Sequence, residues 1–222
     1  MAVDGIVIFG DVVRSRRDAT GSTAWLRTLA AELAEAVPPS DRLADFEFTQ
    51  GDELQGLLAP GVDPFPAILR ASLHPDRRPM RWVAVAGEVD PGRGPATQRT
   101  GPAFLRARGR LTEAAARRDG LLVESGHPPT DALLDDVAPL LAELIGDLTA
   151  RQRVVARLLL VDGLRQSEAA VRLDVSRATV SVAADRAHVR SIGRLADALA
   201  RLLRDGATAA RGAATAAGVV VG

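Results

Sequence analysis

The apolar run Ile6-Val7-Ile8-Phe9, enclosed by Gly5 and Gly10, constrains the fold of this chain more than any other segment. A continuous apolar run bounded by glycine is typical of a β-strand that is covered on both faces. Such a strand needs a sizeable core around it. With 222 residues, 47% of them hydrophobic, the chain is long enough for one such core and a small second unit, so we expect two domains.

The first predicted domain covers residues 1–126 and mixes strands with helices. Periodicity and breaker residues predict further strands at 46–50, 53–58, 80–89 and 121–124, and helices at 22–37, 66–73 and 101–118. The strands 46–50 and 53–58 flank Gly51-Asp52 as a β-hairpin. This order of elements predicts an α+β sandwich of ferredoxin-like character, with the helices on one face of the sheet.

The C-terminal part reads as helical. Residues 127–147 are acidic and leucine-rich and predict a linker helix, and residues 148–204 predict a compact all-helical domain. The tail, 205–222, is almost entirely Ala, Gly, Thr and Val, and we expect it to be disordered. Residues 147–204 hold 11 Arg against 6 acidic residues, a net charge of +5, and the remainder holds 17 Arg against 22, a net charge of −5. A basic unit is thus joined to an acidic one.

Composition excludes several classes of function. The chain has no cysteine, which excludes disulfides and thiolate metal sites and favours a reducing, cytoplasmic environment. No segment approaches the roughly 20 apolar residues that span a bilayer, so no membrane is expected as a partner. No nucleophile set of the Ser-His-Asp type can be assembled from the scattered histidines, and no catalytic residue is assigned.

Two aspartates stand at predicted strand ends: Asp11 after the first strand and Asp52 at the hairpin tip. Mg²⁺ prefers one or two carboxylates together with substrate phosphates, so this pair is the predicted metal site. Glu53 is not expected to join it, because adjacent strand residues point to opposite faces. Guanidinium groups and amides at a helix start suit phosphate oxygens. The expected phosphate-binding residues are Arg14, Ser15, Arg16 and Arg17. The alternative, an ordinary turn with solvated arginines, stays open.

The order of these short frames resembles the catalytic domain of class III nucleotide cyclases. The matching frames are Asp11, Gly51-Asp52, Gly87-Glu88-Val89 and Gly101-Pro102-Ala103, within residues 5–124. The resemblance implies a cyclase-like α/β sandwich that binds a nucleotide with Mg²⁺, and it adds Gly101 to the expected nucleotide-binding residues.

The same resemblance marks departures from a working cyclase. The family's base-selecting lysine falls on Phe48, its transition-state asparagine on Leu105, and its arginine on Gly109, which Arg108 and Arg110 flank. Loss of a donor to transition-state charge typically slows a reaction about 10²- to 10³-fold. We therefore expect a degenerate domain that senses a ligand. An active metal-dependent cyclase or nucleotide hydrolase that uses Asp11 and Asp52 is the alternative.

Residues 149–189 predict a helix-turn-helix. A helix begins behind Thr149, a second covers 166–173, and a third begins at Arg177 behind the cap Ser176. The pattern resembles the sigma region four and LuxR-type helix-turn-helix. On that resemblance the third helix reads double-stranded DNA. The candidate DNA-binding residues are Arg177, Thr179, Ser181 and Arg186. The alternative is a three-helix bundle for packing or dimerisation.

Taken over residues up to Leu203, the chain resembles the SatD family. The shared frames are the Gly10-Asp11-Val12-Val13 start, the 51–58 hairpin, the 101–108 helix and the C-terminal helix-turn-helix. This resemblance implies an architecture more than a mechanism. Because the aspartates are retained and the catalytic positions are replaced, we expect a cytoplasmic DNA-binding regulator with a ligand-sensing domain, and a protein-interaction adaptor is the remaining alternative. A homodimer is expected, since dimers bind two half-sites. The stripe at 192, 195, 199 and 202 is the candidate dimer surface, unless it is buried within its own domain.

Overall fold

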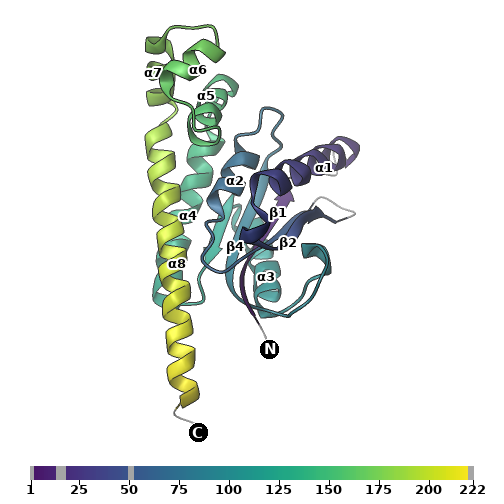
Figure 1. Ribbon diagram of the computed structural model, residues 1–222. Helices are drawn as coiled ribbons and strands as arrows, with labels where there is room; N and C mark the ends of the chain where they lie inside the picture. Colours follow the sequence, from purple (N-terminus) through teal and green to yellow (C-terminus); the bar gives the residue numbers. More distant parts are fainter. Residues whose placement is uncertain (1–2, 14–18, 50–52, 220–222) are drawn as a thin grey trace.

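A computed structural model of the protein describes residues 3–13, 19–49 and 53–219. Within these ranges the chain forms one five-stranded mixed sheet and eight α-helices, which confirms the predicted α+β class. Figure 1 shows the sheet with α1, α2 and α3 beside it, and α4 and the long α8 side by side, with α5, α6 and α7 at one end. Each helix of this described part is too short or too polar to cross a membrane.

The sheet is built around β1. Its strands are β1 (Val3–Val12), β2 (Arg42–Phe48), β3 (Glu53–Leu58), β4 (Met80–Val89) and β5 (Leu121–Glu124). Their order is β2-β3-β1-β4-β5, and neighbours are antiparallel except for β4 and β5, which are parallel. The central place of β1 explains its continuous apolar run, because Ile6, Val7, Ile8 and Phe9 are each at most 3% exposed.

Helices cover both faces of the sheet. Val7 and Phe9 of β1 belong to a core with α3 (Pro102–Arg117), whereas Ile6 and Ile8 belong to a second core on the opposite face. That second core includes α1 (Ala19–Ala36), α2 (Phe65–Ser72) and the C-terminal helices. The prediction that the helices lie on one face is therefore wrong. A strand that is apolar on both faces requires cover on both.

The C-terminal helices share the second core with the sheet. They are α4 (Pro128–Gly146), α5 (Ala150–Leu160), α6 (Gln166–Arg172), α7 (Arg177–Arg186) and α8 (Val189–Val219). Leu134 of α4, Val180 of α7 and Leu199 of α8 are all fully buried in it. Ile192 of the candidate dimer stripe is also fully buried. The stripe therefore packs within its own chain, and its prediction as a dimer surface is wrong.

The predicted disordered tail is helical as far as Val219, as the yellow end of α8 shows in Figure 1. Alanine is the strongest helix former, which favours a helix in this Ala-rich segment. Two contacts hold it against the sheet. Gly206 lets α8 approach the loop after β5, since a Cβ on Gly206 would lie 2.6 Å from the Cβ of Ser125. Arg211 Nη1 lies 3.4 Å from Asp4 Oδ2 at the start of β1.

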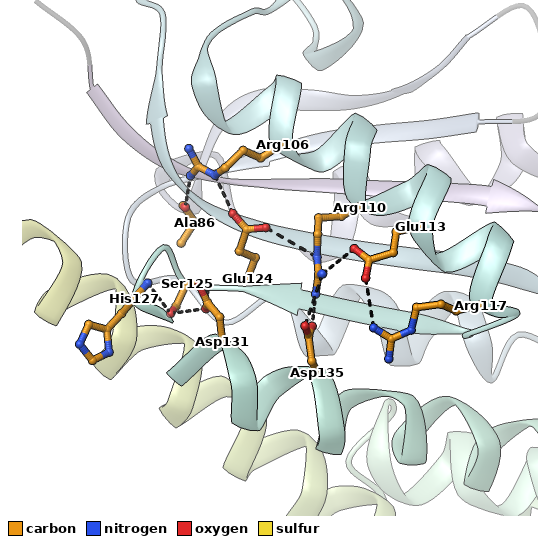
Figure 2. A network of polar contacts seen from close by, with 10 residues as sticks. All are labelled: Ala86, Arg106, Arg110, Glu113, Arg117, Glu124, Ser125, His127, Asp131 and Asp135. Atoms are coloured by element: carbon orange, nitrogen blue, oxygen red, sulfur yellow. Dashed lines mark hydrogen bonds and ion pairs between the residues drawn. The ribbon is translucent and has the colours of Figure 1, made fainter. Parts of the chain in front are cut away.

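A network of arginines and carboxylates joins α3 to α4 (Figure 2). Arg110 of α3 bonds Asp135 of α4, and it lies 2.7 Å from Glu113 Oε2 and 3.6 Å from Glu124 Oε2. Burial alone would lower the pKa of Arg110, but hydrogen bonds and charge from Asp135 and Glu113 outweigh it and raise the pKa. Removing the acidic partners of a half-buried cation destabilises a protein strongly. This network therefore fixes α4 relative to α3.

Two glycines of α8 give a matched test of this packing. Gly206→Ala should lower the free energy of unfolding by about 1 to 3 kcal/mol, because its methyl group would overlap Ser125. Gly212→Ala has no atom within 4 Å of the added methyl group and should raise the free energy of unfolding by up to about 1 kcal/mol through helix propensity. Urea unfolding of both variants measures the difference. Equal gains in both would show that the end of α8 does not pack on the sheet.

Candidate functional site

Charged side chains from three strands meet at the C-terminal end of β1. Asp11 lies directly opposite Glu53 of β3 on one side and opposite Arg81 of β4 on the other. Directly opposed residues of neighbouring strands point to the same face, so the three side chains form a row on the face that α3 covers. Arg81 Nη1 lies 3.2 Å from Asp11 Oδ2.

Arg108 of α3, the helix that covers this face of the sheet, adds a fourth charged side chain to the row. Its guanidinium bonds Glu53, whose carboxylate also accepts a hydrogen bond of 2.5 Å from Gln55 Nε2. The same guanidinium lies 4.8 Å from the ring centroid of Phe9, which adds a cation–π attraction. We call Asp11, Glu53, Arg81 and Arg108 the carboxylate cluster. The sequence analysis excluded Glu53 from the metal site because Glu53 is adjacent to Asp52 and adjacent strand residues point to opposite faces. The register with β1 is the signal that places Glu53 beside Asp11.

Much of the predicted nucleotide site cannot be placed. Asp52 and Arg14, Ser15, Arg16 and Arg17 lie outside the described residues, and Asp11 is the described member of the predicted metal pair. Among the residues that the structure describes, no group of three or more side chains is arranged to hold a metal ion. Carboxylates such as those of Asp11 and Glu53 suit Mg²⁺. Each of these two is held by an arginine, so an ion there would have to displace Arg81 and Arg108.

Gly101 stands away from the carboxylate cluster. It precedes α3 with φ of 128°, and a Cβ there would lie 2.7 Å from the Cα of Val89. Val89 comes eight residues after Arg81 along β4, a span of roughly 26 Å at the rise of a strand. The structure thus separates Gly101 from Asp11, and the close approach to β4 is what requires a glycine here.

The positions at which a cyclase would carry its asparagine and arginine face solvent. Leu105 is 77% exposed, and a Cβ on Gly109 would have no atom within 4 Å. Phe48, in place of the lysine, packs against the second core below Arg27. In the described part of the chain, the α3 residue in the carboxylate cluster is Arg108. It directly precedes Gly109, the position at which the resemblance places the cyclase arginine.

A cavity of about 500 Å³ lies at the other end of the sheet, where β1 begins and β4 and β5 end. Residues 200–214 of α8 form one wall, and both charged and apolar side chains line the cavity. Arg106, which lines it, is held by Glu124 at 2.6 Å and by the carbonyl of Ala86 at 2.8 Å (Figure 2). Because only residues 187 and 188 separate α7 from α8, one helix joins this cavity to the helical unit.

Helix α7 is anchored by buried apolar side chains, and its other side is exposed. Val180 and Ala187 are fully buried, and Ser176 Oγ caps the helix by accepting a hydrogen bond of 3.1 Å from the amide of Thr179. The predicted DNA-binding residues Arg177, Thr179 and Arg186 are exposed, whereas Ser181 is half-buried. The cap and the buried side chains hold the exposed side in a fixed orientation.

The exposed side of α7 borders a hollow of about 620 Å³ beside the start of α5. We call the four exposed α7 residues that line it the α7 face: Ala178, Thr179, Val182 and Arg186. From α5, Thr149, Arg151 and Gln152 line the same hollow, and Gln152 Nε2 donates a hydrogen bond of 3.1 Å to the carbonyl of Arg186. Arg177 and Ser181 do not line it. Sequence reasoning missed Ala178 and Val182, because it selected polar residues alone.

No family model, no curated protein and no solved structure matches this chain. The resemblances carried by the Gly-Asp frames and by the C-terminal helices therefore stay predictions. The carboxylate cluster, the cavity and the α7 face are the features of the structure that bear on function.

A double-mutant cycle tests the bridge between α3 and β3. Glu53→Gln and Arg108→Met should each destabilise the protein, and together they should cost about 1 kcal/mol less than the sum of the single changes. The figure is modest because the Arg108 side chain is 55% exposed. Urea unfolding gives all four free energies. The more exposed pair Glu113 and Arg117, changed in the same way, is the control and should couple by less than about 0.5 kcal/mol. Strict additivity for Glu53 and Arg108 would contradict the bridge.

Proposed function

We propose that this chain is a DNA-binding transcriptional regulator of the SatD type, with a nucleotide-cyclase-like domain that senses a ligand and a helix-turn-helix that reads DNA. One observation carries the proposal: α7 is held by a buried apolar side, is capped at its start, and exposes a face that carries Thr179 and Arg186 together with Ala178 and Val182. The four residues 173–176 join it to α6, as in helix-turn-helix units, in which the second helix enters the major groove.

Electrostatics supports DNA as the partner. The unit 147–204 has a net charge of +5, and Arg151, Arg177 and Arg186 are exposed around α7 and the start of α5. Guanidinium groups suit phosphate oxygens, and phosphate contacts supply most of the sequence-independent affinity for DNA. Asp174 and Asp185 are also exposed and oppose this attraction, so the net charge is modest for one unit. Two units on two half-sites would supply the rest.

The continuity of α8 supports the sensing half of the proposal. This helix lines the cavity with Arg204 and Arg211 and, at its other end, buries Ile192 in the core that also holds α7. A ligand that shifts one part of a stiff helix also shifts the other part, and it changes DNA affinity if it binds the two positions unequally. We propose a nucleotide with Mg²⁺ as the ligand. In the cavity it would act through α8, whereas at the carboxylate cluster, which α8 does not line, Asp11 would hold its metal.

Arginine substitutions on the α7 side should separate DNA binding from folding. Arg186→Ala should weaken binding at least about fivefold and reduce the slope of log affinity against log salt by about 1, because a phosphate contact is lost. Fluorescence anisotropy with a fragment selected from genomic DNA measures both quantities. Arg93→Ala, an exposed arginine between β4 and α3, is the control and should change neither. Equal effects from both variants would mean that only net charge matters.

Calorimetry tests the ligand. The full chain titrated with each nucleoside triphosphate and Mg²⁺ should bind one of them, and Asp11→Asn should weaken that binding at least tenfold, because the carboxylate cluster loses a charge. Arg204→Ala is the matched variant in the cavity. Loss of binding in Arg204→Ala alone would move the nucleotide to the cavity, and no heat with any nucleotide would contradict this part of the proposal.

Enzymatic activity is the second candidate function, and the side-by-side carboxylates of Asp11 and Glu53 favour it. A pair of carboxylates at a strand end is the donor set that a metal-dependent nucleotide cyclase or hydrolase uses. Product analysis after incubation with each triphosphate and Mg²⁺ or Mn²⁺ distinguishes it from sensing. A cyclic or hydrolysed product that Asp11→Asn abolishes would make the domain an enzyme.

A further inference from the structure

The α7 face has an apolar centre and polar margins. Ala178 and Val182 are four residues apart, so they lie one above the other on the helix, and the Val182 side chain is 50% exposed. Arg186 continues this line one turn further along the helix, Thr179 stands beside it, and Arg151 of α5 lines the other side of the hollow. A single exposed valine needs no explanation. Here two exposed apolar residues share one helical side with cations at its margin, and that combination is specific.

The margin and the centre suit different parts of a DNA duplex. Arginine pairs with phosphates along the edges of the major groove, whereas the centre of an inserted helix meets the edges of the bases. In the major groove the apolar feature is the C5 methyl group of thymine, which contacts alanine and other small apolar groups. Arg186 is the one cation among the α7 residues of this face, and it stands one turn beyond Val182 next to the acidic Asp185. We assign it to a phosphate, which leaves Ala178 and Val182 to meet the bases.

Asp185 restricts which part of α7 can approach DNA closely. It is exposed near the C-terminal end of the helix, where its carboxylate repels phosphates, and it does not line the hollow. The first two turns, which carry Ala178 and Val182, are therefore the part that can enter the groove, in keeping with recognition helices that use their N-terminal residues.

We propose that Ala178 and Val182 contact thymine methyl groups, so that the DNA site of this protein carries thymines where α7 meets the bases. This inference rests on the proposed function, because it assumes that α7 enters the major groove. On this inference Ala178 and Val182 determine the sequence preference, and the surrounding arginines supply most of the affinity for DNA.

Replacing thymine by uracil tests this inference, since it removes the methyl group and leaves base pairing unchanged. The full chain is first used to select its binding site from random duplexes, and affinity is then measured with each thymine replaced in turn. At least one replacement in the selected site should weaken binding about fourfold, the effect of one methyl group losing an apolar contact.

Two matched variants link the effect to α7. Val182→Ser removes both methyl groups and should reduce the ratio of thymine to uracil affinity toward 1. Val171→Ser is the control: Val171 lies on α6, is 84% exposed and is not part of the hollow, so its ratio should match the original protein. Circular dichroism confirms that both variants fold.

The outcomes distinguish the inference from the proposed function. DNA bound with equal affinity in its thymine and uracil forms would overturn the inference and leave the regulator in place. A selected site without thymine would also overturn the inference and leave the regulator in place. Failure to select any duplex would contradict DNA binding itself, and the inference with it.

Discussion

Burial of β1 on both faces is the constraint on which the rest of the structure depends. One face of the strand is covered by α3, and the other by α1, α2 and the C-terminal helices. Apolar surface buried in this way contributes about 25 cal/mol for each Å² removed from water, so neither cover can be removed cheaply. The helical unit that carries α7 is thus part of the layer that completes the fold, and the second core runs without interruption from Ile8 to Val180.

Arginine supplies the polar links between these layers. The chain has no lysine, and guanidinium groups bind several acceptors in a fixed plane, which suits them to bridges between elements. Arg108 joins α3 to β3, Arg110 joins α3 to α4, and Arg211 joins α8 to β1. The carboxylate cluster shares this chemistry, so its charges serve the fold as it stands. Any ligand there competes with arginines that the protein itself provides.

Periodicity in the sequence was sufficient to predict the strands, most helices and the turn before α7, because these depend on local patterns. Arrangement across the sheet was not local. The face covered by α3, the separation of Gly101 from Asp11 and the place of Glu53 beside Asp11 all follow from strand order and register, which spacing along the chain does not encode. Composition misled at the tail, where Gly206 is a contact point with Ser125. The candidate residues on α7 were all polar, so the exposed Val182 was not among them.

The length of α8 has a consequence for how this chain can vary. A helix of 31 residues extends about 46 Å and turns by about 100° per residue. Inserting or deleting one residue between Leu199 and Gly206 would rotate the lower half against the upper, so that Gly206 would no longer meet Ser125 while Ile192 kept its place. Substitutions on the solvent side of this segment do not change the rotation of one half of α8 relative to the other. We therefore expect α8 to tolerate most substitutions on its solvent side but not insertions or deletions, even in the Ala-rich part.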